Sequence, residues 1–189
     1  MSGLKLYKGL FITFEGGEGS GKTTHVALLG EKLRSMGYDV LVTKEPGAGE
    51  SSICRDIRSM LLQEREEPLA PIAELLLFHA DRAQHIEQSI RPALANKRIV
   101  LCDRFSGSTW AYQGTRGHDP EILRYLQELV QGGLRPDFTV FLDPGEEEAR
   151  HRMAWRNKEE GNTELRFDNE AVSFHEEVWR RYRVMYPRY

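Results

Sequence analysis

The sequence predicts an α/β protein in which a parallel β-sheet is covered by helices. Short apolar runs typical of buried strands alternate along the 189 residues with longer helical patterns. Strands that alternate with helices form parallel sheets through right-handed crossovers, which place helices on both faces. A composition of 40% hydrophobic and 29% charged residues suits a single globular domain over residues 1–189.

Strands and helices can be placed along most of the chain. The expected strands are the nearly continuous apolar runs at 10–14, 39–44, 98–103 and 137–143. The expected helices cover 22–36, 53–62, 71–94, 119–131 and the charged region after residue 146. Gly37 and Gly132 are placed to end two of them, and Pro92 is placed to bend or end the helix at 71–94. Because ligands bind at the carboxyl ends of such strands, functional residues should follow them directly.

Composition and charge exclude several classes of protein. A net charge of −3 gives no overall attraction to nucleic acid or to anionic membranes, so phosphate binding requires a local cluster. Cys54 and Cys102 are far apart in the sequence and form neither a disulfide framework nor a metal-ligand set. No segment approaches the ~18 apolar residues of a membrane span, and the first residues lack the apolar core of a signal peptide. We therefore expect a cytoplasmic protein that binds neither nucleic acid nor membrane.

A glycine-rich loop follows the first expected strand. The stretch GGEGSGKT at 16–23 fits the phosphate-binding pattern G-x-x-x-x-G-K-[ST], and it lies between a strand and a helix, as that motif requires. Glycine reaches at low cost the torsions that point backbone N–H groups at a polyphosphate, and the helix N-terminus adds positive potential. Lys22 can reach the β- and γ-phosphates of ATP, and the Thr23 hydroxyl is placed to bind Mg²⁺.

The motif therefore predicts a site for a nucleoside triphosphate and Mg²⁺. It does not identify the phosphate acceptor, since GTPases, motor ATPases and small-molecule kinases all share it. A glycine-serine turn with a chance lysine is the alternative. The expected ATP-binding residues are Gly16, Gly17, Glu18, Gly19, Ser20, Gly21, Lys22, Thr23 and Thr24.

A charged pair ends the third expected strand. Asp103 would lie beside the phosphate loop and hold Mg²⁺ directly or through water. Arg104 would point into the same crevice, where it could bridge two phosphoryl groups and stabilise the charge of an in-line transfer. An exposed Asp–Arg pair without catalytic function is the alternative.

Polar and aromatic side chains on two expected helices could recognise a planar base. Phe78 and Arg82 lie four residues apart, so a ring and a fork of donors share one face, although Phe78 could equally belong to the core. The second set follows Arg104 on a helical turn and comprises Ser108, Thr109, Tyr112 and Gln113. The alternative for this set is a plain helix end.

The segment at about 150–168 is expected to form a lid. A basic helical hairpin after the fourth strand could close over ATP and bring an arginine to the transferring phosphoryl group. The glutamates of the same segment make a solvated, salt-bridged face an equal alternative. The candidate arginines are Arg152, Arg156 and Arg166.

Several of these motifs together resemble those of thymidylate (dTMP) kinases in order and spacing, from about Gly9 to Tyr182. They are FEGGEGSGKTT, KEPG, LLFHADRAQHI, DRFSGSTWAYQG, PDFTVFLD and RFDNE. The resemblance implies a P-loop nucleoside monophosphate kinase fold with a helical lid, and the direct reaction ATP + dTMP → ADP + dTDP. It also implies Mg²⁺ as cofactor, with Thr23 and Asp103 as its ligands, and a homodimer whose interface includes the helix at 71–94.

The resemblance further implies a role for individual residues. Glu18 would face the deoxyribose 3′-hydroxyl, Arg104 would bind the dTMP phosphate, and Tyr112 would press on the sugar where a 2′-hydroxyl would sit. Phe78 would stack on thymine, whose edge would be read by Arg82, Thr109 and Gln113. The implied dTMP-binding residues are Glu18, Glu45, Arg58, Phe78, Arg82, Arg104, Ser108, Thr109, Tyr112 and Gln113.

The phosphate loop contains no arginine, and members of this kind, mainly bacterial, carry the catalytic arginine on the lid. The implied catalytic residues are therefore Lys22, Arg104, and Arg152, Arg156 or Arg166. Two alternatives to dTMP phosphorylation are open. One is another P-loop monophosphate kinase, acting on dUMP or UMP. The other is a nucleotide-gated regulatory module, although the sequence has no guanine-reading N-K-x-D motif.

Overall fold

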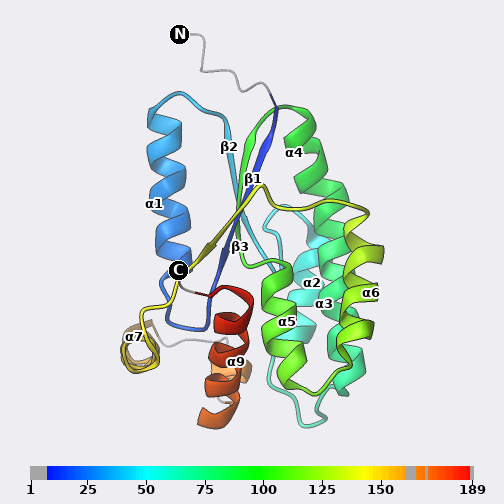
Figure 1. The fold of residues 1–189 in the computed structure, drawn as a ribbon, viewed down its shortest axis with the longest axis vertical. Coiled ribbons are helices and arrows are strands. Elements are labelled where there is room, and N and C mark those ends of the chain that lie inside the picture. The colour runs from blue at the N-terminus through cyan, green and yellow to red at the C-terminus, as the bar shows by residue number, and fades with distance from the viewer. Residues whose placement is uncertain (1–7, 161–164, 169, 188–189) are drawn as a thin grey trace.

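The computed structural model describes residues 8–160, 165–168 and 170–187. Among these residues one four-stranded sheet forms, in the strand order β2-β3-β1-β4. Its strands are β1 (Leu10–Glu15), β2 (Val40–Lys44), β3 (Ile99–Asp103) and β4 (Phe138–Phe141). Every pairing is parallel, so the carboxyl ends of all strands lie at one edge of the sheet (Figure 1). The predicted parallel α/β architecture is confirmed.

Helices pack on both sides of this sheet. They are α1 (Lys22–Ser35), α2 (Ser52–Leu62), α3 (Pro71–His85), α4 (Arg91–Ala95), α5 (Ser106–Thr115), α6 (Pro120–Gln131), α7 (Glu146–Glu160), α8 (Leu165–Asp168) and α9 (Val172–Met185). In Figure 1, α1 lies on one side of the sheet and α2 to α6 lie on the other, while α7 and α9 gather at the carboxyl ends of the strands. The site predicted from the strand ends is thus enclosed by helices.

The core follows from the alternation of side chains along the strands. On one face, Phe14 of β1 and Leu101 of β3 pack with Val26 of α1. On the other face, Phe11 and Val100 pack against the helical segment that runs from α3 into α4. A third cluster joins α5, α8 and α9 and contains Ala111, Tyr112, Phe167, Phe174, Val178 and Tyr182. The C-terminal helix is therefore attached to the molecule mainly through α5.

The helix expected at 71–94 contains a change of winding that the sequence did not specify. A π-helical turn, Ile86–Ile90, joins α3 to α4, and the Arg91 N–H bonds to the Ile86 carbonyl. Pro92 has no N–H and would clash with a carbonyl four residues earlier in a regular α-helix. A wide turn directly before such a proline lets the segment continue to Ala95, because it redistributes the hydrogen bonds.

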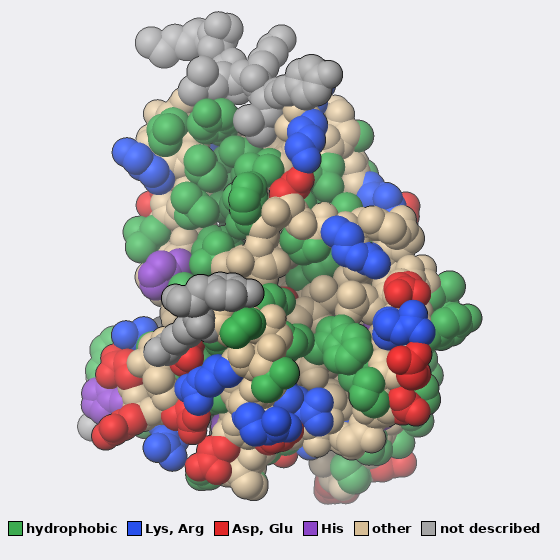
Figure 2. All heavy atoms as spheres, viewed as in Figure 1, with side chains coloured by type: hydrophobic (Ala, Val, Ile, Leu, Met, Phe, Trp, Pro, Cys, Tyr) green, Lys and Arg blue, Asp and Glu red, His purple; other side chains and the backbone are tan. Residues whose placement is uncertain are grey.

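The surface divides into an apolar and a charged region. Figure 2 shows hydrophobic side chains over the upper part of the face in view and charged side chains over the lower part, around α7 and α9. Phe138, on the edge strand β4, is among the exposed apolar residues. No helix in the described part of the chain is long and apolar enough to cross a membrane.

Candidate active site

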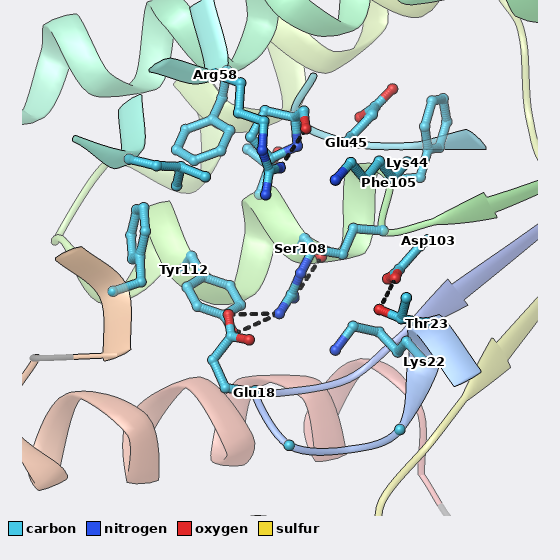
Figure 3. A pocket seen from close by; sticks show the side chains of 18 of the residues that line it. Glu18, Lys22, Thr23, Lys44, Glu45, Arg58, Asp103, Phe105, Ser108 and Tyr112 are labelled. Atoms are coloured by element: carbon cyan, nitrogen blue, oxygen red, sulfur yellow. Dashed lines mark hydrogen bonds and ion pairs between the residues drawn. The ribbon is translucent and has the colours of Figure 1, made fainter. Parts of the chain in front are cut away.

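A cleft of about 720 Å³ opens at the carboxyl ends of the strands. This volume is ordinary for a nucleotide-sized ligand. Figure 3 shows the phosphate loop with Glu18 and Lys22, the segment after β2 with Glu45, and Ser108 and Tyr112 of α5 around this cleft. Helix α3 and helix α7 also contribute lining residues to the cleft. Every residue that the resemblance implied for dTMP binding lines it: Glu18, Glu45, Arg58, Phe78, Arg82, Arg104, Ser108, Thr109, Tyr112 and Gln113. The structure therefore brings together residues that are far apart in the sequence.

The phosphate loop requires glycine for two reasons: its backbone adopts positive φ angles, and helix α7 approaches it closely. Gly19 and Gly21 have φ values of 70° and 89°, in the left-handed region that favours glycine. A side chain at Gly19 would collide with the carbonyl oxygen of Ala149, which belongs to α7. Because the loop and the lid helix touch at this point, the geometry of one constrains the other. Gly19, Gly21, Lys22, Thr23 and Thr24 line the cleft together with Glu18, whereas Gly16, Gly17 and Ser20 lie behind them.

Lys22 is held against the loop that precedes it. Its ammonium is buried and donates hydrogen bonds to the Gly17 carbonyl at 2.8 Å and to Ser20 Oγ at 3.0 Å. Burial, with a smaller contribution from the Arg104 guanidinium, lowers the pKa of Lys22 to about 8. The Glu18 and Asp103 carboxylates oppose this lowering of the pKa, and a polyphosphate in the loop would add to their negative charge.

Thr23, in the first turn of α1, lies next to Asp103, the last residue of β3. The Thr23 hydroxyl donates to Asp103 Oδ2 at 2.6 Å (Figure 3). A hydroxyl and a carboxylate side by side beside a phosphate loop are hard oxygen ligands of the kind that Mg²⁺ prefers. The residues present therefore fit the expected metal.

Arg104 lines the cleft and bonds to two of its walls. Its Nη2 donates to Glu18 Oε1 at 2.7 Å and to the Tyr112 hydroxyl at 3.2 Å, and Nη1 donates to the Gly16 carbonyl at 3.0 Å. Ser108 Oγ accepts a further bond at 3.3 Å. The backbone of Arg104 has a φ of 70°, which is unusual for a residue with a side chain and is typical of functional positions.

Arg82 of α3 bonds both to the segment after β2 and to α5. It is 2% exposed, and its donors bond to Glu45 Oε2 at 2.8 Å, Thr109 Oγ1 at 2.9 Å and the Phe105 carbonyl at 3.0 Å. Burial would raise the pKa of Glu45, but the Arg82 guanidinium and a hydrogen bond from His85 outweigh it and lower that pKa. The ion pair therefore holds this wall of the cleft in one conformation.

The lid arginines have different surroundings. Arg152 lines the cleft, and its Nη1 would lie 3.6 Å from a Cβ at Gly21 of the phosphate loop. Arg166 instead donates to the Leu61 carbonyl at 2.6 Å and forms an ion pair with the buried Glu74. The side chain of Arg156 lies outside the described residues. Of the three candidate arginines, Arg152 is the one whose described side chain lies near the phosphate loop.

Sequence analysis missed several residues that support these side chains. Glu74 accepts from Gln113 Nε2 at 3.1 Å, so it links the expected base reader to Arg166. Glu15 and Tyr182 form a buried network behind Arg104. The sequence gives only a weak signal for Glu74 and Glu15, because a carboxylate inside an apolar helix or at the end of an apolar strand belongs to no motif. The contacts of these carboxylates depend on elements that are far away in the sequence.

The fold and the site together define a class of protein. A phosphate loop between β1 and α1, an aspartate and an arginine at the end of β3, and a helix over the cleft after β4 are the parts of a P-loop kinase for a small nucleotide. The family model for thymidylate kinase matches residues 14–187. The chain belongs to the thymidylate kinase family.

Individual relatives agree with this assignment. The thymidylate kinase of Desulfovibrio desulfuricans is 48% identical over 179 residues, which cover 93% of this chain and 82% of that protein. The thymidylate kinase of Pelobacter propionicus is 49% identical over 175 residues, covering 90% and 78%. The crystal structure of thymidylate kinase from Ehrlichia chaffeensis superposes with a TM-score of 0.67 at 37% identity, covering 80% of this chain and 83% of that one. The predicted fold, family and reaction, ATP-dependent phosphorylation of dTMP to dTDP, are confirmed.

Proposed function

We propose how the residues of this cleft divide the work of phosphorylating dTMP with ATP. The observation that carries the proposal is the position of Arg104, which contacts both walls of the cleft. Its guanidinium bonds to Gly16 and Glu18 of the phosphate loop and to Ser108 and Tyr112 of α5. A cation at this junction can bind the acceptor phosphate while it faces the donor.

The phosphate loop is the donor side. The loop N–H groups, the N-terminus of α1 and Lys22 would bind the phosphates of ATP. Thr23 and Asp103, whose side chains lie 2.6 Å apart, would hold Mg²⁺. When bound, Mg²⁺ supplies positive charge that offsets the charge of the β- and γ-phosphates.

Helices α3 and α5 form the acceptor side. Phe78 would stack on thymine, and Gln113 and Thr109 would present polar groups to its edge beside the fixed Arg82. The ring of Tyr112 would lie against the sugar, and Glu18 would accept the 3′-hydroxyl. Arg58, which lines the same cleft and donates to the Pro46 carbonyl, would hold the loop after β2 near the acceptor phosphate.

Transfer would be direct and in line, with no covalent enzyme intermediate. Arg104 from the acceptor side and Arg152 from the lid would stabilise the charge on the transferring phosphoryl group. The proposed lid covers about residues 150–168, within one domain of residues 1–189. Closure of this segment would exclude water from the reaction.

An assay of ADP release across nucleoside monophosphates tests this assignment. We expect the highest kcat/KM with dTMP, lower values with dUMP and UMP, and no turnover without Mg²⁺. Better turnover with another acceptor would contradict the assigned acceptor pocket. Binding of dTMP measured by calorimetry separates this enzyme from a regulatory P-loop module, which should not bind dTMP.

The protein is also proposed to form a homodimer through α3 and α6. These helices contact each other, and apolar side chains on both are about half exposed or more: Ile72, Leu76, Ile122, Tyr125 and Leu129. A second copy would bury this surface. Sedimentation equilibrium should give a dimer for the wild type and a monomer for Leu76→Glu; a monomeric wild type would contradict the proposal.

A cytoplasmic location stays a prediction from the sequence.

A further inference from the structure

Glu15, the last residue of β1, has a carboxylate buried away from the cleft. The residue is 1% exposed. Its oxygens accept hydrogen bonds from the Phe105 N–H at 2.9 Å, from Ser108 Oγ at 2.7 Å and from the Tyr182 hydroxyl at 3.1 Å. No cationic side chain among the described residues forms an ion pair with it. Burial raises the pKa of Glu15, while the Ser108 bond and the charge of Arg104 oppose this rise.

One of these bonds fixes the backbone that carries Arg104. The Arg104 N–H bonds to the Phe14 carbonyl at 2.9 Å, and the next N–H, that of Phe105, bonds to Glu15. Between them Arg104 keeps a φ of 70°, which needs support from its surroundings. Phe105 is also the N-cap of α5, which has no side-chain cap of its own in the described structure. Glu15 therefore supplies the hydrogen-bond acceptor that caps the start of α5.

The other bonds reach the guanidinium of Arg104 through two hydroxyls. Ser108 Oγ lies 2.7 Å from Glu15 Oε2 and 3.3 Å from Arg104 Nη1. The Tyr182 hydroxyl lies 3.1 Å from the same carboxylate oxygen and 3.4 Å from the same nitrogen. The two hydroxyl oxygens lie 2.8 Å apart, so either proton could bond to the other hydroxyl in place of Glu15. A side chain at Gly107 would come 2.9 Å from the Glu15 carboxyl carbon, so glycine permits this close approach.

We propose that Glu15 is a positioning residue for the phosphate of dTMP. It fixes the backbone of Arg104 directly and its guanidinium through Ser108 and Tyr182. Neither Glu15 nor Tyr182 lines the cleft, so both would act through Arg104 rather than on the substrate. Because Tyr182 belongs to α9, the C-terminal helix becomes part of the acceptor-phosphate site. This inference rests on the proposed role of Arg104.

Binding of dTMP and of thymidine to the Glu15→Gln variant tests the proposal. The amide keeps the shape of the carboxyl group and replaces one of its acceptor oxygens with an NH₂ donor. Thymidine has no phosphate, so it reports on the base and sugar sites alone. We expect the Kd of dTMP to rise about tenfold, as for loss of a buried hydrogen-bond acceptor, and that of thymidine to stay within about twofold. Glu31→Gln, an exposed change on α1, is the matched control and should alter neither.

A double-mutant cycle with Arg104→Ala tests whether Glu15 affects dTMP binding through Arg104. In that background Glu15→Gln should cost no further dTMP affinity, because its effect passes through Arg104. Equal loss of dTMP and thymidine affinity, or a full additional loss without Arg104, would overturn the proposal. If Arg104→Ala itself leaves dTMP binding unchanged, the assigned role of Arg104 is wrong instead.

Tyr182→Phe keeps the proposal testable if Glu15→Gln does not fold, a state that a circular-dichroism melt would detect. This variant removes one hydroxyl and leaves Glu15 in place. We expect it to weaken dTMP binding about threefold and to leave thymidine binding unchanged. An unchanged ratio of the two affinities would overturn the proposal.

Discussion

Glu18 and Arg104 form an ion pair in the cleft, with Oε1 of the first 2.7 Å from Nη2 of the second. Their side chains are 20% and 15% exposed, and the Tyr112 hydroxyl bonds to both. A carboxylate of the phosphate loop thus occupies a donor of the arginine proposed to bind the acceptor phosphate. The substrate phosphate must share or replace this partner, while the sugar gains Glu18 as an acceptor for its 3′-hydroxyl.

Glu18→Gln should separate these two effects when dTMP is compared with its 3′-deoxy analogue. The variant removes the competing charge from Arg104, so we expect it to bind the analogue about threefold more tightly than the wild type does. It also weakens the contact with the 3′-hydroxyl, so the preference of the wild type for dTMP over the analogue should disappear. Calorimetric Kd values for both ligands measure the change.

Glu148→Gln serves as the matched control, because Glu148 pairs with the exposed Arg152 rather than with Arg104. It should leave both Kd values unchanged. A Glu18→Gln variant that retains the full preference for dTMP over the analogue would show that Glu18 does not face the 3′-hydroxyl.

Arg152→Ala should lower kcat about 10²-fold and leave the KM for dTMP within about threefold, because a lid arginine acts mainly on the transition state. Arg152 is about half exposed, so its loss should change stability by less than about 1 kcal/mol. Arg166→Ala is the informative comparison. Arg166 is bound to Glu74 and Leu61, and its removal should affect stability and the KM for dTMP more than kcat. The reverse pattern, in steady-state assays of both variants, would assign catalysis to Arg166.

The fold was predictable because local patterns decide it. Apolar strands such as 98–103 and glycine stops such as Gly132, whose φ of 51° ends α6, depend on neighbouring residues. The residues at the strand ends were predictable as well, since parallel topology brings them to one edge of the sheet. The π-helical turn at Ile86–Ile90 was harder to predict, because a proline such as Pro92 indicates a disturbed helix without specifying the type of turn.

The support behind the site was not predictable from the sequence. Glu15 meets Tyr182 across 167 positions, and Glu74 meets Arg166 across 92. Both pairs depend on where α9 and α8 pack, and packing has no local signature. The same limit applies to Arg166, whose partners Leu61 and Glu74 lie far from it in the sequence.

Tyr112→Leu should lower the preference for dTMP over its ribonucleotide, 5-methyluridine monophosphate, at least about tenfold. The reason is steric, because the ring that would exclude a 2′-hydroxyl is replaced by a smaller side chain. Tyr112→Phe is the control: it keeps the ring and should keep the preference within about twofold. The ring packs against Phe167 and Tyr182, so Tyr112→Leu should also cost about 2–3 kcal/mol of stability. Ratios of kcat/KM, measured well below the melting temperature, decide whether the ring sets sugar selectivity.

The stability of the protein should depend on pH through Lys22. The lysine pKa is 10.5 in an unperturbed chain and about 8 in the folded protein. Below pH 8 both states are protonated, and the full cost of burying the ammonium is present. Between pH 8 and 10.5 the unfolded state binds more protons, so the free energy of unfolding rises with pH.

Comparison with Lys22→Met isolates this dependence, because other groups titrate alike in both proteins. The difference in unfolding free energy, wild type minus variant, should increase by roughly 3 kcal/mol from pH 7 to pH 10.5. Urea unfolding at several pH values measures it. A difference independent of pH would show that Lys22 keeps an ordinary pKa. Saturating ATP should also flatten the rise, since bound phosphate favours the ammonium and moves its pKa back toward the unperturbed value.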